Sequence, residues 1–526
     1  MDSNKLLNDV LRRFSIDTEH SAAAHEEVQH WQREPEINDP SLQDWTHFAF
    51  VTIDNPDSRD LDQALLIEPL TVNDPSDGSA QTGFRCRYAL ADAYHYVQPG
   101  TALFNEALAR GASYYLPGRS IPMLPVALSE DLVSLNENVP RRAIVFDMTL
   151  SADGTCTNTE IIRARIQSQA KLSYEGVQRW LDGNALPNDP VIPEPAAESI
   201  ELLKVLGTRL IQNAANRDVI QFDRRETEIS TTENGFELQE RDRYETERYN
   251  EQISLLCNMQ GAKMLQSMNR AHPDLQAIFR VHDAPLKSRI ADFEQNLKAL
   301  INARGLDERF QRQPRQSLAD YVSALPDNEE SQRVVQAIER QVLMTNQASQ
   351  FRAEPGRHHA LGAASYARFS SPMREIVGIF THKELLEALG AVTPTDAAVD
   401  TQIRASIIEA ANSAKQRQKQ IGKAIEFAVI DDYLQRDLDK PEPVTHSGTV
   451  MGFRSGKIYV AIDDLAVDLK VYLDDLSEQY NTDYSLQDAC ASPADSQRPL
   501  FVLGDAVEIS ARAFDPEKRR FQLNLF

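Results

Sequence analysis

The 526-residue sequence predicts an α+β fold that ends in a small β-barrel, and three observations support this prediction. Strand-like runs dominate from residue 47 to about residue 165. Amphipathic helical patterns prevail from about residue 197 to residue 437. After the linker KPEPVTH, at residues 440–446, five or so short strands alternate with turn residues, which is typical of a small closed barrel.

The elements are expected in a definite order along the chain. NKLLNDVLRRF and AAAHEEVQHW each predict a short helix before residue 47. The strands that follow are FAFVTI, ALLIEPL, FRCRYALADAYHYV, AIVFDMTL and EIIRARI, with NDPSDGSAQTG as a long hairpin loop. A strand-like stretch, DVIQFDRRETEISTTENGFELQ, interrupts the helices, and NTDYSLQDACASPADSQRP is expected to be a loop of the barrel. The predicted units are a helical segment at 1–46, a mixed domain at 47–439 and the barrel at 444–526.

Composition and charge exclude several classes of protein. The formal net charge of −24 argues against a mainly electrostatic nucleic-acid binder or a membrane-surface protein, although it is compatible with a local basic channel. The cysteines are far apart and no CxxC or HExxH motif occurs, so zinc and disulfide interpretations are weak. No apolar stretch is long enough to cross a bilayer, and the expected location is the cytoplasm.

The stretch TIDNPDSRDLDQAL, at residues 52–65, contains a dense group of carboxylates. Asp60 and Asp62 are two residues apart and face the same way on an extended chain, and Asp54 can fold back onto them. Converging carboxylates need cations, and oxygen-only ligands favour Mg²⁺ or Mn²⁺. Such ions can clamp both sides of a phosphoryl transfer. The motif alone leaves a solvated, aspartate-rich turn as the alternative.

The motifs around this stretch resemble the RNB catalytic domain of the ribonuclease II and ribonuclease R family. They include YALADAYHYV, YYLPGRSIPMLPVALSEDLVSLN, KLSYEGVQRWL, IFRVHDAP and EPGRHHALGAASYARFSSPMRE, in the family's order. The terminal barrel resembles the family's S1 domain, an OB-fold module. The resemblance implies processive 3′-to-5′ hydrolysis of single-stranded RNA to nucleoside 5′-monophosphates with Mg²⁺, with Mn²⁺ as a substitute, by a monomer that binds no membrane. The family's pair of N-terminal cold-shock barrels cannot fit in 46 residues, so a shortened member is expected.

The resemblance also implies catalytic residues. Asp54, Asp60 and Asp62 match three of the family's four catalytic aspartates, with Asp62 at the position closest to the chemistry. Gln63 stands where the fourth aspartate is usual, so it is expected to be an uncharged metal ligand. Arg374, in SPMR, matches an arginine that grips phosphate near the metals.

Four further residues are expected to bind RNA by the same resemblance. Tyr115 matches a tyrosine that packs against the terminal base, and Tyr174 matches one close to the scissile end. Phe222 is expected on the other side of the base stack. Glu251 falls where the family has a glutamate that contacts ribose.

The chain departs from the family pattern at other positions. After SPMR the family has a basic residue, a tyrosine and, two positions further, an aspartate, where this chain has Glu375, Ile376 and Gly378. Gly422 replaces a usual glutamate, and Glu426 lies one turn further along the same predicted helix. An active exoribonuclease is the favoured hypothesis. A degenerate member that binds RNA as a regulator, and a phosphodiesterase that acts on DNA or nucleotides, are the alternatives.

The barrel offers aromatic and basic side chains that fit an RNA-binding face. They are Phe453, Lys457, Tyr459 and Tyr472. The aromatic residues among them fit the barrel core equally well, and the sequence leaves both interpretations open.

Overall fold

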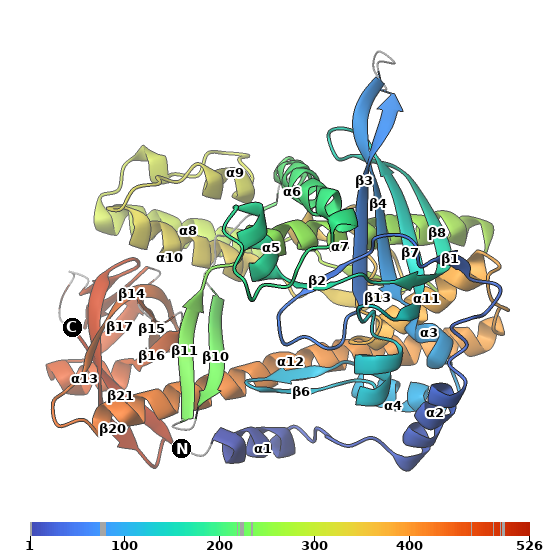
Figure 1. The fold of residues 1–526 in the computed structure, drawn as a ribbon. Coiled ribbons are helices and arrows are strands. Elements are labelled where there is room, and N and C mark those ends of the chain that lie inside the picture. Colours follow the sequence, from blue (N-terminus) through green and yellow to red (C-terminus); the bar gives the residue numbers. More distant parts are fainter. Residues whose placement is uncertain are drawn as a thin grey trace.

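Two β regions, joined and covered by helices, make up the chain in the computed structural model (Figure 1). It describes residues 3–73, 80–217, 219–220, 226–232, 235–463, 465, 467–487, 489–494, 496 and 500–526. The predicted α+β class is confirmed. Among the described residues, no helix combines the length and the apolar character needed to cross a membrane.

The larger β region is a five-stranded sheet with the strand order β1-β8-β7-β4-β3. All neighbours are antiparallel except β1, which pairs parallel with β8. The central strands β4 and β7 are buried over most of their length, which explains their continuous apolar runs. Both β3 and β4 extend into the segment expected as a long loop, whose residues 74–79 lie outside the described chain. The bounds are β1 (Gln43–Trp45), β3 (Gln63–Asn73), β4 (Ala80–Ala91), β7 (Pro140–Leu150) and β8 (Cys156–Gln167).

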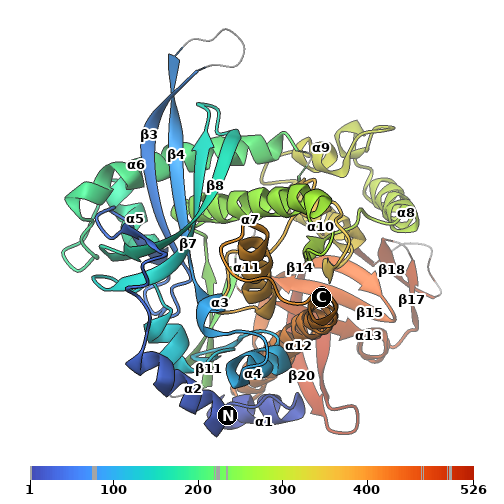
Figure 2. The ribbon, with the colours of Figure 1, turned by 90° about the vertical axis from the view of Figure 1, so that its right-hand side faces the viewer.

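Helices pack around this sheet and extend away from it. The first residues of α11, from Ile376 to Leu386, are all buried, and Figure 2 shows this helix in the middle of the molecule. α12 has 42 residues and runs from the sheet region to the C-terminal strands (Figure 1). The helices are α1 (Ser3–Arg13), α2 (Ala22–Arg33), α3 (Ala93–Tyr96), α4 (Ala102–Arg110), α5 (Tyr174–Leu181), α6 (Glu194–Ala215), α7 (Glu245–Ala271), α8 (Lys287–Arg304), α9 (Leu318–Ser323), α10 (Gln332–Thr345), α11 (Ile376–Ala388) and α12 (Ala397–Leu438).

Short strand pairs lie between the sheet and the helices. The predicted strand-like break is a hairpin of β10 and β11, and the two helices predicted before residue 47 are α1 and α2. The pairs are parallel β2 (Thr52–Asp54) with β9 (Lys171–Ser173), and antiparallel β5 (Tyr114–Leu116) with β6 (Arg119–Ile121), β10 (Glu226–Thr232) with β11 (Gly235–Arg241), and β12 (Phe279–Val281) with β13 (Gln350–Arg352).

A small apolar core, separate from the core of the large sheet, joins α1 to α12 and to two hairpins. Its buried members come from α1, the β5–β6 hairpin, β11 and α12. They are Leu7, Val10, Leu11, Tyr114, Leu116, Ile121, Phe236, Ile421, Ile425 and Val429. The amphipathic spacing of α1 therefore reflects a real buried face.

The C-terminal β region has a five-stranded antiparallel sheet in the order β16-β15-β14-β20-β21, consistent with an OB-fold. The segment expected as a loop instead forms β17 and β18, because Leu486 is half-buried and Cys490 is buried against neighbouring elements. The elements are β14 (Thr445–Arg454), β15 (Lys457–Ile462), β16 (Asp468–Tyr472), α13 (Leu473–Tyr480), β17 (Tyr484–Gln487), β18 (Cys490–Pro493), β19 (Phe501–Val502), β20 (Ala506–Asp515) and β21 (Arg520–Leu525).

This β region shares its apolar packing with helices that precede it. Met451, Cys490 and Leu503 belong to one buried cluster with Phe293 of α8 and Val342 of α10. Arg304 of α8 reinforces the contact by donating to the Leu503 carbonyl at 2.7 Å. The barrel and the helices α8 and α10 therefore stabilise one another.

Candidate active site

The aspartate-rich loop between β2 and β3 is held at both ends and in its middle. Val51 and Leu65 exchange two backbone hydrogen bonds, which close the loop at its base. In the middle, the Leu61 amide donates to Ser134 Oγ at 2.9 Å, and that hydroxyl donates to the Arg59 carbonyl at 2.7 Å. Because the backbone is fixed, the carboxylates that follow have defined directions.

Asp62 is the most buried carboxylate of the loop, with 2% of its surface exposed. One oxygen accepts from the Met373 amide at 2.9 Å, and the other accepts from Arg374 Nε at 2.5 Å. Burial raises the pKa of Asp62 to about 6, although the Arg374 guanidinium opposes the rise. The structure thus brings together two residues that the sequence separates widely.

Asp54 and Asp60 complete the group of carboxylates around Arg374. The pKa of Asp60 is also raised by burial, against the opposing charge of Arg374. Asp60 accepts from the Tyr115 hydroxyl at 3.2 Å, and Asp54 accepts from Ser58 Oγ at 2.9 Å. One guanidinium therefore faces three acidic side chains, which leaves an excess of negative charge.

Gln63 lies directly beside this group, but its amide is used within the protein. Its Nε2 donates to the Ser370 carbonyl at 2.5 Å, and its Oε1 accepts from the Tyr88 hydroxyl. Tyr88 is completely buried in the sheet. An ionised aspartate could not donate to the Ser370 carbonyl, so this hydrogen bond is a structural explanation for the glutamine at this position.

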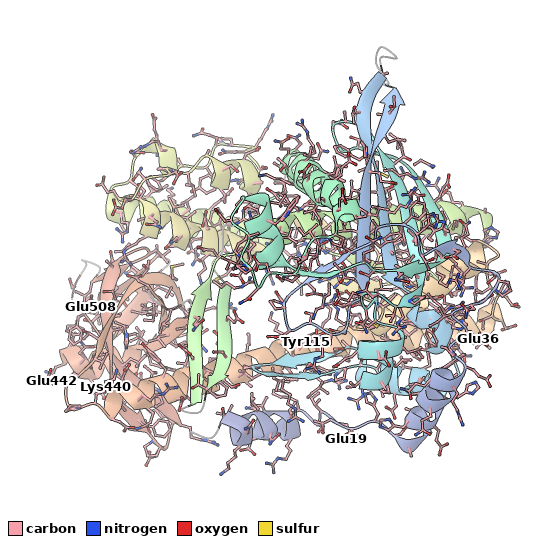
Figure 3. All side chains as sticks on the ribbon, in the orientation of Figure 1. Glu19, Glu36, Tyr115, Lys440, Glu442 and Glu508 are labelled. Carbon is pink, nitrogen blue, oxygen red and sulfur yellow. The ribbon has the colours of Figure 1, made fainter. Side chains whose placement is uncertain are left out.

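A cavity of about 760 Å³ is lined by Asp60 and by both predicted tyrosines. Tyr115 is 54% exposed on the β5–β6 hairpin, near the middle of the molecule in Figure 3. Tyr174 begins α5 directly after the capping Ser173, which pairs with Asp54 across β2 and β9. Burial raises the pKa of Tyr174 to about 12, and its hydroxyl accepts from Asn250 Nδ2 at 3.1 Å.

The other two predicted RNA contacts have different outcomes. Glu251 lies on α7 next to Asn250, and its carboxylate pairs with Arg243 at 3.0 Å. The loop and hairpin around it contribute Arg241 and Tyr244 to the cavity wall. Phe222 lies outside the described residues.

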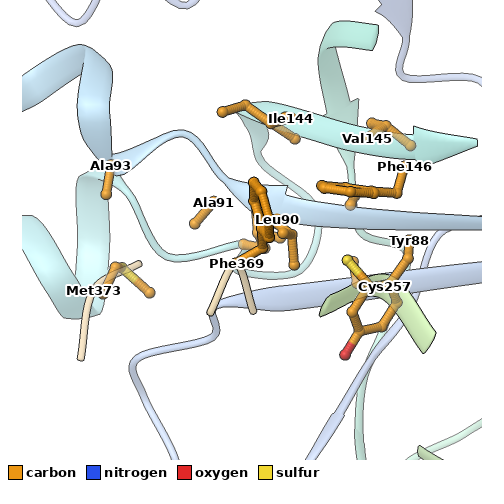
Figure 4. Packing of buried hydrophobic residues seen from close by; sticks show 14 of the residues in the cluster. Tyr88, Leu90, Ala91, Ala93, Ile144, Val145, Phe146, Cys257, Phe369 and Met373 are labelled. Atoms are coloured by element: carbon orange, nitrogen blue, oxygen red, sulfur yellow. The ribbon is translucent and has the colours of Figure 1, made fainter. Parts of the chain in front are cut away.

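A buried asparagine that sequence reasoning missed fixes the segment that carries Arg374. Asn258 of α7 donates to the Tyr366 hydroxyl and to Ser370 Oγ, both at 2.9 Å, and accepts from the Phe369 and Ser370 amides. Figure 4 shows Phe369 and Met373 packed among apolar residues of the sheet. A polar residue on the apolar face of LLCNMQ was the available signal, because buried polar groups need partners.

The departures from the family pattern have structural partners. Glu375 pairs with Arg368 at 3.1 Å. Burial alone would raise the pKa of Glu375, but Arg368, Arg280 and Lys415 hold it below its usual value. Glu426 lies elsewhere, near Lys470 of the barrel, so it does not join the carboxylates around Arg374.

A second acidic group lies away from this site and has a different character. Among the described residues, Glu384, Glu387 and Asp400 form the one group whose possible ligand atoms all lie within 4.8 Å of one another. Lys383 Nζ contacts all three carboxylates, at 2.9, 2.8 and 2.7 Å. Because an ammonium already stands among them, we assign this group to structural ion pairing. The carboxylate oxygens of Asp54, Asp60 and Asp62, around Arg374, are spaced more widely than those of this second group.

Comparisons with known proteins give a family match and several relatives. Residues 42–391 match the family model described as RNB domain. The chain is 26% identical over 492 residues to ribonuclease R of Escherichia coli (strain K12), covering 92% of this chain and 57% of that relative. The chain thus spans less than two thirds of the length of this relative.

Solved structures share the fold. The chain is similar to Mycoplasma genitalium RNase R in complex with ribose methylated single-stranded RNA, with a TM-score of 0.84, 21% identity and coverage of 100% of this chain and 78% of that one. It is also similar to yeast Ssd1, described as a pseudonuclease, with a TM-score of 0.64, 14% identity and coverage of 97% and 58%. At these identities the likeness establishes the fold alone.

Proposed function

The chain belongs to the RNB domain family, and we propose that it is a processive 3′-to-5′ exoribonuclease that hydrolyses single-stranded RNA to nucleoside 5′-monophosphates. The observation that carries the proposal is the pairing of the buried Asp62 with the half-buried Arg374, next to Asp60, which lines the same cavity as Tyr115 and Tyr174. The names of the relatives support it, since one is a ribonuclease R and another was solved with single-stranded RNA.

We assign a Mg²⁺ requirement to this site, with Asp54, Asp60 and Asp62 as ligands and Mn²⁺ as a substitute. The raised pKa values of Asp60 and Asp62 fit this assignment, because burial destabilises their charged forms more than Arg374 stabilises them, and a bound cation would favour the charged forms. When bound, Mg²⁺ polarises a phosphoryl oxygen and lowers the pKa of an attacking water. The Gln63 oxygen retains one lone pair beside the Tyr88 hydrogen bond and is the proposed fourth ligand.

The remaining residues bind and orient the RNA in this proposal. Tyr115 and Tyr174 contact the terminal nucleotides, because flat aromatic rings stack on any base. Arg374 would bind the phosphate through guanidinium N–H groups other than the Nε that donates to Asp62. Glu251 accepts from a ribose 2′-hydroxyl, which distinguishes RNA from DNA.

One observation favours a second candidate function, an RNA-binding regulator without turnover. Both polar atoms of the Gln63 amide are engaged within the protein, by Ser370 and Tyr88, at the position where the family has a charged ligand. The similarity to a protein described as a pseudonuclease adds to this alternative. Asp54, Asp60, Asp62 and Arg374 are all present, so the enzyme is the preferred proposal.

Labelled single-stranded RNA separates the two candidates. The purified chain is incubated with RNA labelled at the 5′ end or at the 3′ end, with Mg²⁺ or with a chelator, and the products are sized on a gel. The enzyme produces a labelled mononucleotide at once from 3′-labelled RNA and, because it is processive, a short end product with few intermediates from 5′-labelled RNA, only with the metal. Binding without any product supports the regulator, and internal fragments contradict the exonuclease.

A further inference from the structure

A second pocket lies behind the β5–β6 hairpin, on the other side from the active-site cavity. It has a volume of about 390 Å³ and is bordered by the connection between α1 and α2, by the end of α4 and by α12. Adjacent residues of a strand point to opposite faces, so Tyr114 lines this pocket whereas Tyr115 lines the cavity. The volume lies within the usual range of ligand sites, roughly 300–1,000 Å³. The proposed function assigns this pocket no role.

Hydrogen bonds hold the connection between α1 and α2 against α4. Arg110 of α4 donates to two backbone carbonyls of this connection, one of which is the Asp17 carbonyl at 2.7 Å. Glu106 of α4 accepts from the Ser21 amide and from His20 Nδ1, both at 2.6 Å. Because these bonds fix the backbone of the connection, the side chains on this wall of the pocket have defined positions.

His20 carries an acceptor that no group in the described part of the chain uses. Its side chain is 7% exposed, and Nδ1 holds the ring proton, because the ionised Glu106 can only accept. Burial alone would raise the pKa of Glu106, but hydrogen bonds from Ser21 and His20 hold it below its usual value. Burial lowers the pKa of His20, which favours the neutral ring. His20 Nε2 is therefore a buried lone pair to which no described residue donates.

Arg417 brings a cation to the same pocket from α12. Its side chain is half-buried, and among the described residues no hydrogen bond or ion pair engages its guanidinium. Burial raises the pKa of Tyr114, and the nearby charge of Arg417 opposes the rise. Of the acids that line the pocket, Asp17 and Glu19 are exposed to solvent and Glu106 is already hydrogen-bonded. The guanidinium is therefore available to an anion such as a phosphate group.

These two groups define the chemistry of the ligand. The lone pair of His20 requires a hydroxyl or N–H group, and Arg417 requires an anionic group. We propose that the pocket is a second nucleotide site, which binds a nucleoside 5′-monophosphate with its phosphate at Arg417 and a ribose or base donor at His20. This inference goes beyond the proposed function and rests on it only for the source of the ligand, because nucleoside 5′-monophosphates are the products of the proposed reaction.

Calorimetric titration of the full chain in chelator tests the second site. The titrants are adenosine 5′-monophosphate, adenosine and inorganic phosphate, which offer the anion and the donors together and separately. Arg417→Gln removes the cation, and Lys419→Gln, at an exposed position of α12, is its control. His20→Asn removes Nε2 but keeps a side-chain N–H group for Glu106. Tyr115→Ala reports on nucleotide binding in the active-site cavity instead.

The monophosphate should bind at least about 10-fold more tightly than adenosine or phosphate, because a hydrogen bond to a charged group is worth about that factor. Arg417→Gln should weaken binding about 10-fold or more and His20→Asn about 5-fold, and Lys419→Gln and Tyr115→Ala should leave the affinity of this site within about two-fold.

Three outcomes would overturn the second site. They are a loss of binding in Tyr115→Ala with none in Arg417→Gln, phosphate that binds as tightly as the monophosphate, and no binding of the monophosphate at millimolar concentration. Arg417→Gln breaks no hydrogen bond within the described chain, so it is expected to fold as the wild type does. Because the titration uses neither RNA nor metal, its failure leaves the proposed function standing, and a failure of the cleavage assay leaves the titration unchanged.

Discussion

The cavity and the outward face of the barrel use opposite means to handle charge. Around Arg374, burial raises the pKa values of Asp60 and Asp62, and the position of Asp62 depends on contacts with a distant part of the chain. On β15 and β16, lysines are half-exposed and their positions follow from strand alternation. The comparison indicates that the partly buried carboxylates at the cavity lower folding stability and support chemistry. The half-exposed lysines of the barrel face lower folding stability little and support binding.

The largest expected effect separates the two regions by function. Asp62→Asn keeps the side-chain shape but removes charge from the proposed metal site, so single-turnover cleavage of labelled RNA should fall by about 10² to 10³ or more. Binding of long RNA should persist, because the stacking residues and the barrel lysines remain. Asp57→Asn, the same change at an exposed aspartate lining the cavity, should retain most of the activity. Equal cleavage by the wild type and Asp62→Asn would remove Asp62 from the site.

The second prediction concerns stability. Without metal, the carboxylate of Asp62 should lower the free energy of unfolding at neutral pH. Burial raises the pKa of Asp62 to about 6 in the folded chain, against an ordinary value of 3.8, so the folded state holds the proton more tightly. As pH rises from about 4 to about 6, the unfolded state loses its proton first and stability falls. The loss amounts to about 3 kcal/mol.

Urea unfolding with chelator, at pH 4 and at pH 7, measures this loss. Asp62→Asn should be more stable than the wild type at pH 7 and should gain little at pH 4, where Asp62 is largely protonated in the wild type. Mg²⁺ should restore the stability of the wild type and leave the variant unchanged. A variant that is less stable than the wild type at pH 7 would show that Arg374 fully compensates the carboxylate.

The third prediction concerns Gln63, where a substitution should also lower folding stability in the absence of metal, by a smaller amount. Gln63→Glu removes the donor to the Ser370 carbonyl and places a carboxylate beside it, which should cost about 1–3 kcal/mol in chelator. Mg²⁺ should reduce this loss, since a charged ligand at this position would serve the metal. Gln402→Glu at an exposed position of α12 is the control for adding a charge. If Mg²⁺ has no influence on the difference, Gln63 lies outside the metal site.

The smallest effect belongs to the barrel face. Lys457→Ala removes one half-exposed cation, so RNA affinity at moderate salt should fall only a few-fold and the cleavage rate at saturating RNA should not change. The slope of log affinity against log salt should decrease by about 0.7. Lys440→Ala, at an exposed lysine that Figure 3 labels near the end of α12, is the control. A loss of cleavage at saturation would contradict the division between the regions.

The structure also changes which experiment suits the barrel. Deleting residues 444–526 would remove the whole barrel, but Met451 and Leu503 belong to a buried cluster with α8 and α10. Removing them exposes that cluster, so the truncated chain is expected to be less stable. Single substitutions on the outward face are therefore the sharper test.

Sequence reasoning succeeded where a short pattern carries the information. Apolar runs predicted β3, β4, β7 and β8 of the large sheet, but missed β1 and the helix α3, which lies inside a segment expected to be strand. The aspartate spacing pointed to the loop at residues 54–62. The pairing of Asp62 with Arg374 could not be predicted from the sequence, because the pairing depends on Asn258 and on the packing of Phe369. The strand β17 was mistaken for a loop because its polar and turn-forming neighbours hide one half-buried leucine.

Glu426 illustrates the same limit on a helix. Its position one turn from Gly422 suggested that it could supply the missing acid, but α12 is about 63 Å long at 1.5 Å per residue. Residues along it therefore reach different regions, and Glu426 lies beside the barrel lysine Lys470. The spacing in the sequence indicated which face of the helix Glu426 lies on, but not which side chains lie next to it.

The small core under the two hairpins has a consequence for how the chain folds during synthesis. Leu7 and Leu11 of α1 leave the ribosome long before Ile421 and Val429, which cover them. Contacts between such distant segments form late because loop closure must come first. The apolar face of α1 is therefore exposed through most of translation, and the β5–β6 hairpin reaches its final support only when α12 arrives.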